Sequence, residues 1–89
     1  MTWSIDLDPR ARRELKHLDQ QVARRINRFL FERVAPLENP RSIGEALKGT
    51  ELGDLLKYRV GDYRIIASIE DNLIRILVVR IGNRREVYR

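Results

Sequence analysis

Two stretches in which apolar and polar residues alternate, residues 55–60 and 63–69, are separated only by Gly61 and Asp62. A period of two places every second side chain on the same face of a β-strand. A two-residue connection that contains glycine is typical of the tight turn in a β-hairpin. The pattern therefore predicts an antiparallel hairpin, and any fold for this chain has to contain it.

Helical signals come before the hairpin. Residues 2–7 alternate as a short strand, and the pair Asp8-Pro9 then predicts the start of a helix that ends near Leu18. Asp19 predicts a second helix cap, followed by an apolar stripe that ends near Pro36. Two helices with almost no loop between them form a helical hairpin.

The remaining segments complete the expected fold. The connector 36–54 is broken by proline and glycine and has room for one helical turn around residues 45–47. The apolar run 73–81 predicts a strand inside the sheet, Gly82-Asn83 should break it, and residues 84–89 suit an edge strand. Helices followed by a run of strands predict a single α+β domain over 1–89. Its helices would cover one face of a mostly antiparallel sheet and leave the other face open.

The charge balance favours an anionic partner. Lysine and arginine together number 18 against 13 acidic residues, for a formal net charge of +5. Fifteen of these cations are arginine, whose planar fork binds phosphate or carboxylate through two hydrogen bonds. The composition therefore indicates phosphate recognition.

Several chemistries are excluded by the residues present. The chain has no cysteine and only one histidine, His17, so a thiol nucleophile and a two-histidine acid/base pair are ruled out. No carboxylate spacing suggests a metal site, and no glycine-rich phosphate or dinucleotide motif is present, so we expect no cofactor and a metal-independent reaction. No apolar run approaches the roughly 20 residues of a membrane span. We expect a cytoplasmic protein without a membrane partner.

The candidate site lies on the open face of the predicted sheet. Lys57 and Arg59 share one face of their strand, and Arg64 lies across the turn on the same face, with no carboxylate expected between them. Such a cluster suits a phosphodiester, although basic side chains also solvate many exposed sheet faces. Arg84 and Tyr88 follow the glycine break, and their loop could fold over this patch or form a frayed tail.

Phe31 lies away from the apolar stripe of the second helix. We expect it to pack beneath the connector 36–54. The alternative is an exposed ring that receives a partner helix.

Two segments carry a family resemblance. Residues 56–66 (LKYRVGDYRII) and 80–89 (RIGNRREVYR) resemble the RelE branch of the RelE/ParE toxin superfamily, and the helical hairpin with residues 46–49 (ALKG) fits the same pattern. The resemblance implies a toxin of a type II toxin–antitoxin system that enters the ribosomal A site and cuts messenger RNA. In that reaction the ribose 2′-hydroxyl attacks the adjacent phosphate without a metal.

The resemblance also implies roles for particular residues. Lys57, Arg59 and Arg64 would stabilise the transition state, Arg84 would contact the phosphate or leaving group, and Tyr88 would stack on a base and activate the 2′-hydroxyl. Further RNA contacts are expected from Arg80, Arg85 and Arg89. The implied partners are an acidic, RelB-like antitoxin, the ribosome with its messenger RNA, and operator DNA only through the antitoxin complex.

Two positions depart from the family pattern. Arg59 stands where well-known members have a lysine proposed as a proton donor, and arginine, with a pKa above about 12, is a poor acid. Asn83 stands where relatives often have a basic residue or histidine. Two other functions stay open: a ParE-like toxin that binds DNA gyrase, and a non-catalytic module that binds only an antitoxin and DNA.

Overall fold

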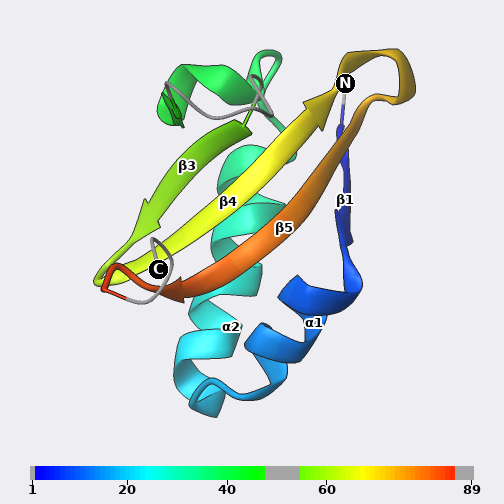
Figure 1. Ribbon diagram of the computed structural model, residues 1–89. Helices are drawn as coiled ribbons and strands as arrows, with labels where there is room; N and C mark the ends of the chain where they lie inside the picture. The colour runs from blue at the N-terminus through cyan, green and yellow to red at the C-terminus, as the bar shows by residue number, and fades with distance from the viewer. Residues whose placement is uncertain (1, 48–54, 86–89) are drawn as a thin grey trace.

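The computed structural model describes residues 2–47 and 55–85, and its helices and strands follow one another along the chain as Figure 1 shows. The elements are β1 (Ser4–Leu7), α1 (Pro9–Lys16), α2 (Gln20–Arg28), a π-helical continuation of α2 (Phe29–Val34), a 3-10 helix (Pro40–Ile43), β2 (Glu45–Ala46), β3 (Leu55–Val60), β4 (Tyr63–Glu70), a second 3-10 helix (Asp71–Leu73) and β5 (Arg75–Asn83). No helix within these described ranges is long and apolar enough to cross a membrane.

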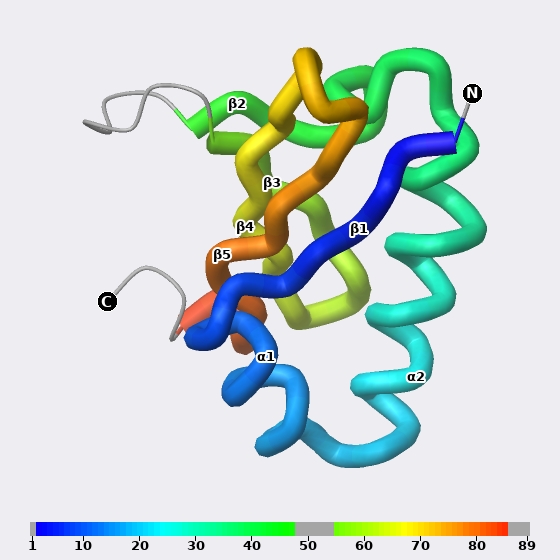
Figure 2. The backbone as a smooth tube through the Cα atoms, turned by 90° about the vertical axis from the view of Figure 1, so that its right-hand side faces the viewer, coloured from blue at the N-terminus to red at the C-terminus, as the bar shows by residue number. Residues whose placement is uncertain are grey.

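The described strands form one mixed sheet in the order β1-β5-β4-β3-β2. β1 runs parallel to β5, and the other neighbouring pairs are antiparallel. Both helices lie on the same side of the sheet, and Figure 2 shows α2 running along that side. The predicted α+β fold, its hairpin and its single helical layer are confirmed.

The helix starts follow the predicted caps. The side chain of Asp8 accepts a hydrogen bond from the backbone N–H of Ala11 at 2.9 Å, and Pro9 opens α1. Asp19 likewise accepts from Gln21 at 3.1 Å and opens α2. Each carboxylate satisfies one of the N–H groups that a first helical turn leaves without a partner.

The core fills the space between the helices and the sheet. The period-two pattern sends every second side chain of β3, β4 and β5 toward α2. The buried apolar residues that form this cluster are Trp3, Ala11, Ile26, Leu30, Val34, Leu56, Tyr58, Val60, Ile65, Ala67, Ile69, Ile76, Val78 and Ile81. Tyr58 is fully buried, and its hydroxyl donates a 2.6 Å hydrogen bond to the carbonyl of Pro40. This bond attaches the connector to the centre of β3.

The connector differs from the sequence-based prediction. Its helical turn covers Pro40–Ile43, where Asn39 caps the turn, and not residues 45–47. Glu45 and Ala46 form β2, which pairs with Lys57 and Leu56 of β3. The prediction was wrong because the exposed edge of β3 offers hydrogen-bond partners to this segment, a long-range effect that local sequence does not encode.

The last strand begins and ends two residues later than the sequence predicted. Leu73 lies in a 3-10 turn, and Ile74 has a positive φ of 48°, so β5 begins at Arg75. It continues through Gly82 and Asn83, where we expected a break, and Arg84 and Arg85 form a turn. As predicted, β5 has strand neighbours on both sides. Residues 86–89 of the expected edge strand lie outside the described residues.

Phe31 is 58% exposed. The expectation that it packs beneath the connector is wrong, because the π-helical turn places Leu30 and Val34 in the core instead.

Candidate functional site

The β3–β4 register brings predicted site residues onto one face. Arg59 is opposite Arg64, and Lys57 is opposite Ile66, so these side chains project from the face remote from the helices. In β5, Arg80 is opposite Ile66 in the same row. Arg59 is exposed, whereas the side chain of Lys57 is largely covered. The sequence therefore predicted the parity of this face correctly.

Arg64 lies on this face, but its side chain is buried, whereas we expected it to be exposed to solvent. It is only 8% exposed, and its Nη1 atom donates hydrogen bonds to the carbonyls of Gly61 at 3.1 Å and Tyr63 at 3.0 Å. The long side chain folds back on the hairpin turn, where the two carbonyls hold one end of its guanidinium. Arg64 is thus a fixed cation, which suits the stabilisation of a developing negative charge.

A carboxylate lies between two of the cations, contrary to expectation. Glu45 of β2 approaches the Nζ of Lys57 at 3.1 Å and the Nη2 of Arg59 at 3.8 Å. Its hydrogen bond with Lys57, together with the charges of Lys57 and Arg59, holds the pKa of the Glu45 carboxyl below its usual value. The expectation of a cluster without a carboxylate was wrong because β2 was predicted as a helical turn.

The segment after β5 reaches the hairpin turn. The backbone N–H of Arg84 donates a 3.0 Å hydrogen bond to the carbonyl of Asp62, and Asn83 accepts from the N–H of Arg85 at 3.1 Å. A cavity of about 220 Å³ is lined by Asp62, Asn83, Arg84 and Arg85. The hydrogen bond from Arg84 to Asp62 places Arg84 beside the turn whose carbonyls bind Arg64. Tyr88 and Arg89 lie outside the described residues.

Arg80 has a partner that the sequence did not reveal. Its Nε lies 3.1 Å from an oxygen of Glu14 in α1, and the other oxygen of Glu14 accepts a 3.0 Å hydrogen bond from the N–H of Ile81. Glu14 therefore attaches α1 to β5, beyond the part of β5 that pairs with β1. The contact of Arg80 with RNA stays a prediction.

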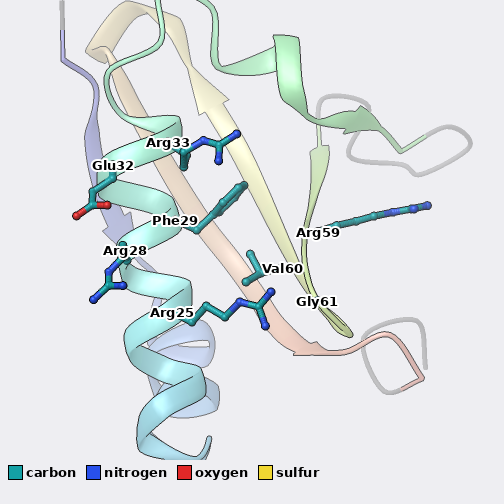
Figure 3. Close-up of a pocket in the computed structure, with 8 residues that line it drawn as sticks. All are labelled: Arg25, Arg28, Phe29, Glu32, Arg33, Arg59, Val60 and Gly61. Atoms are coloured by element: carbon teal, nitrogen blue, oxygen red, sulfur yellow. The ribbon is translucent and has the colours of Figure 1, made fainter.

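A second cationic region lies behind β3, on the helix side. A cavity of about 490 Å³ is bordered by α2, its π-helical continuation and the end of β3. Its lining residues are Arg25, Arg28, Phe29, Glu32, Arg33, Arg59, Val60 and Gly61. Figure 3 shows Arg25, Phe29 and Arg33 reaching toward β3, whereas Arg59 extends from the far side of the strand. We missed this group, although Arg25, Phe29 and Arg33 recur at helical i, i+4 and i+8 spacing.

Other proton-transfer candidates lie away from the basic face. His17 is exposed at the end of α1. Burial raises the pKa of the Tyr58 phenol to about 12, and its hydroxyl donates a hydrogen bond to the carbonyl of Pro40. The described residues also contain no group of three or more carboxylates or histidines placed to bind a metal ion. The face offers fixed positive charge above all.

Comparison with known proteins identifies the family of this chain. A family model described as the ParE toxin of a type II toxin–antitoxin system matches residues 5–88. A relative named toxin RelE from Mycobacterium tuberculosis is 30% identical over 87 residues, which cover 98% of this chain and 87% of the relative. The mRNA interferase toxin RelE of Escherichia coli K12 is 30% identical over 90 residues, covering 99% of this chain and 92% of the relative.

Solved structures show the same fold. A mutant E. coli RelE toxin in the free state superposes with a TM-score of 0.78 at 28% identity, covering 99% of this chain and 92% of that one. The toxin in a RelBE-type toxin–antitoxin complex from M. tuberculosis reaches a TM-score of 0.84 at 23% identity, covering 97% and 95%.

Proposed function

Because this chain belongs to the RelE/ParE superfamily of toxins from type II toxin–antitoxin systems, we propose that it is an endoribonuclease that cuts messenger RNA in the ribosomal A site. The observation that supports the proposal is that Lys57, Arg59 and Arg64 share one face of the β3–β4 hairpin, with the backbone N–H of Arg84 bonded to its turn. A phosphodiester in the transition state carries extra negative charge, and oriented cations stabilise it more than they stabilise the ground state.

The proposed reaction is an internal transfer within the RNA. The ribose 2′-oxygen forms a bond to the adjacent phosphorus as the bond from phosphorus to the 5′-oxygen of the next nucleotide breaks. The 2′-hydroxyl loses its proton and the leaving 5′-oxygen gains one, which gives a 2′,3′-cyclic phosphate and a 5′-hydroxyl. No external oxidant, reductant or metal is required.

Each cation has a proposed part in this reaction. Arg64, held by the carbonyls of Gly61 and Tyr63, stabilises the phosphorane charge, and Lys57 and Arg59 assist it. Arg84 contacts the phosphate or the leaving oxygen. Tyr88 stacks on a base and takes the 2′-hydroxyl proton, with Lys57 as the other candidate base.

The proposed partner in the resting state is an antitoxin. Solved relatives include RelBE toxin–antitoxin complexes, and the net charge of +5 favours an acidic chain. We propose that carboxylates of this antitoxin lie near the basic face and that operator DNA is reached only through the complex.

One assay separates the candidate functions. Purified toxin is added to ribosomes programmed with a defined message, and the RNA ends are mapped. Cleavage within the A-site codon supports the proposal. Intact message with inhibited DNA gyrase would instead indicate a ParE-like toxin, and intact message with active gyrase would indicate a module that only binds.

A further inference from the structure

The cavity behind β3 borders the basic face at the hairpin turn, where Arg59 and Gly61 line it. The carbonyl of Gly61 accepts the hydrogen bond from Arg64, whose side chain lies on the open face of the sheet. A methyl group on the Cα of Gly61 would lie 3.1 Å from Nη1 of Arg25, so the guanidinium of Arg25 covers the same turn from the helix side. An extended ligand that is bound on the basic face and continues past the turn would therefore reach Arg25 next.

Arg25, Phe29 and Arg33 form a regular row along the cavity. They are four residues apart along α2 and its π-helical continuation, which places them on about the same side of this helical segment. In the view of Figure 3 the ring of Phe29 lies between the side chains of Arg33 and Arg25, and Val60 lies between the ring and Arg25. The ring packs edge-on against Tyr58 at a centroid distance of 6.0 Å, which fixes its orientation while part of it stays accessible.

The charge of this cavity is not neutralised within the described residues. Four arginines and one glutamate line it, and the described part of the chain provides no ion pair to Arg25, Arg28 or Arg33. All three are exposed. Cations that flank an aromatic ring match single-stranded nucleic acid, because phosphates bind the arginines and an unpaired base stacks on the ring.

We propose that this cavity is a second RNA-binding site, in which Arg25 and Arg33 bind consecutive backbone phosphates of single-stranded RNA and Phe29 stacks on the base between them. The site rests on the proposed function, since it would hold RNA that continues past the catalytic face around the Gly61 turn. Its three RNA-binding residues are not among the proposed catalytic residues, although Arg59 borders both regions, and it makes or breaks no bond.

The experiment measures binding of a fluorescent single-stranded RNA oligonucleotide over a range of salt concentrations. We expect the double variant Arg25→Gln/Arg33→Gln to bind about tenfold more weakly, as charge-assisted hydrogen bonds are lost. The salt dependence of log affinity should fall by about 1.4, because each phosphate contact contributes about 0.7 for single strands. Phe29→Leu should weaken binding about fivefold without changing this slope.

The matched control removes the same charge elsewhere. Arg12→Gln/Arg24→Gln changes two exposed arginines that do not line the cavity. Equal losses of RNA affinity in both double variants would overturn the proposal, because they would indicate a non-specific electrostatic attraction between RNA and the whole protein. Unchanged RNA affinity together with weaker antitoxin binding would also overturn it, in favour of a protein interface.

Cleavage by the wild type keeps the two proposals distinguishable. If the wild type cuts the message and the cavity variants bind RNA like the control, the second site is refuted and the proposed function stands. If the wild type does not cut but the cavity variants lose RNA binding selectively, the RNA site stands and the nuclease proposal fails.

Discussion

The carboxylate of Glu45 lies 3.1 Å from the ammonium nitrogen of Lys57. The two residues are directly opposite in the β2–β3 register, so the short strand β2 places a negative charge on the face that is proposed to bind phosphate. Because its pKa is lowered from 4.5, Glu45 is ionised throughout the neutral pH range. RNA would therefore have to compete with it for Lys57.

We expect Glu45→Gln to raise the affinity for single-stranded RNA by a few-fold at low salt. The gain is small because exposed ion pairs are weak, and it should vanish at high salt as the charges are screened. Glu38→Gln, which neutralises another exposed carboxylate, is the control. An RNA affinity of Glu45→Gln that equals or falls below the wild type would show that Glu45 does not compete with phosphate.

Tyr58 offers a test of the core that is independent of catalysis. Tyr58→Phe removes the hydroxyl that donates to Pro40 and leaves a buried carbonyl without its partner. We expect a loss of about 1–3 kcal/mol in the free energy of unfolding, measured by urea denaturation, with RNA cleavage unchanged. A lost cleavage activity in a folded Phe variant would mean that this phenol takes part in the reaction.

The buried phenol of Tyr58 should also make the free energy of unfolding depend on pH. Burial disfavours the phenolate, so the folded-state pKa of about 12 lies above the reference value of 10.0. The unfolded chain releases this proton first, and stability should therefore be complete below pH 10 and decline from pH 10 toward pH 12. Urea midpoints of the wild type should fall more steeply over this interval than those of Tyr58→Phe; parallel curves would contradict this assignment.

Gly61 is required by the geometry of the hairpin turn. Its φ is +60°, and a side chain there would also approach Arg25. We expect Gly61→Ala to lower the free energy of unfolding by about 1–2 kcal/mol, whereas Gly61→Asn should cost less because asparagine tolerates the left-handed region. Thermal denaturation of both variants measures the difference. If the Arg25→Ala background abolished the cost, the close approach and not the backbone conformation would be its cause.

Local sequence predicted much of this molecule because the relevant interactions are local. The caps Asp8 and Asp19 bond to N–H groups two or three residues away, and the parity of Lys57, Arg59 and Arg64 follows from the period of a strand. These features need no knowledge of the tertiary structure.

The missed features depend on segments far apart in the chain. Glu45 reaches Lys57 only because β2 adds to the edge of β3, and Glu14 reaches Arg80 across 66 residues. The burial of Arg64 arises from the way its side chain folds back on the turn. The cavity behind β3 exists only when α2 packs on the sheet, so the i, i+4 and i+8 spacing from Arg25 to Arg33 did not by itself indicate a cavity.

Arg64 and Arg84 both form hydrogen bonds to the hairpin turn, Arg64 through its side chain and Arg84 through its backbone N–H. We expect Arg64→Ala and Arg84→Ala each to slow cleavage by about 100- to 1000-fold, which corresponds to about 2.7–4 kcal/mol, by analogy with the loss of one oriented oxyanion donor. Arg64→Lys keeps the charge but loses the planar fork, so we expect an intermediate rate. The measurement is single-turnover cleavage of a message on programmed ribosomes.

Folding controls decide how these rates are interpreted. Arg64 is 8% exposed, so its variants require a urea denaturation curve, whereas Arg84 is exposed and should leave stability unchanged. Arg24→Ala on α2 serves as the control for net charge, because it lies outside both cavities that border the hairpin. Near-normal cleavage by folded Arg64→Ala and Arg84→Ala would refute the assignment of the active site to this face. A loss in Arg84→Ala with normal stability would support it even if Arg64→Ala failed to fold, because Arg84 is an exposed residue of the turn after β5 and can be changed independently of Arg64 in β4.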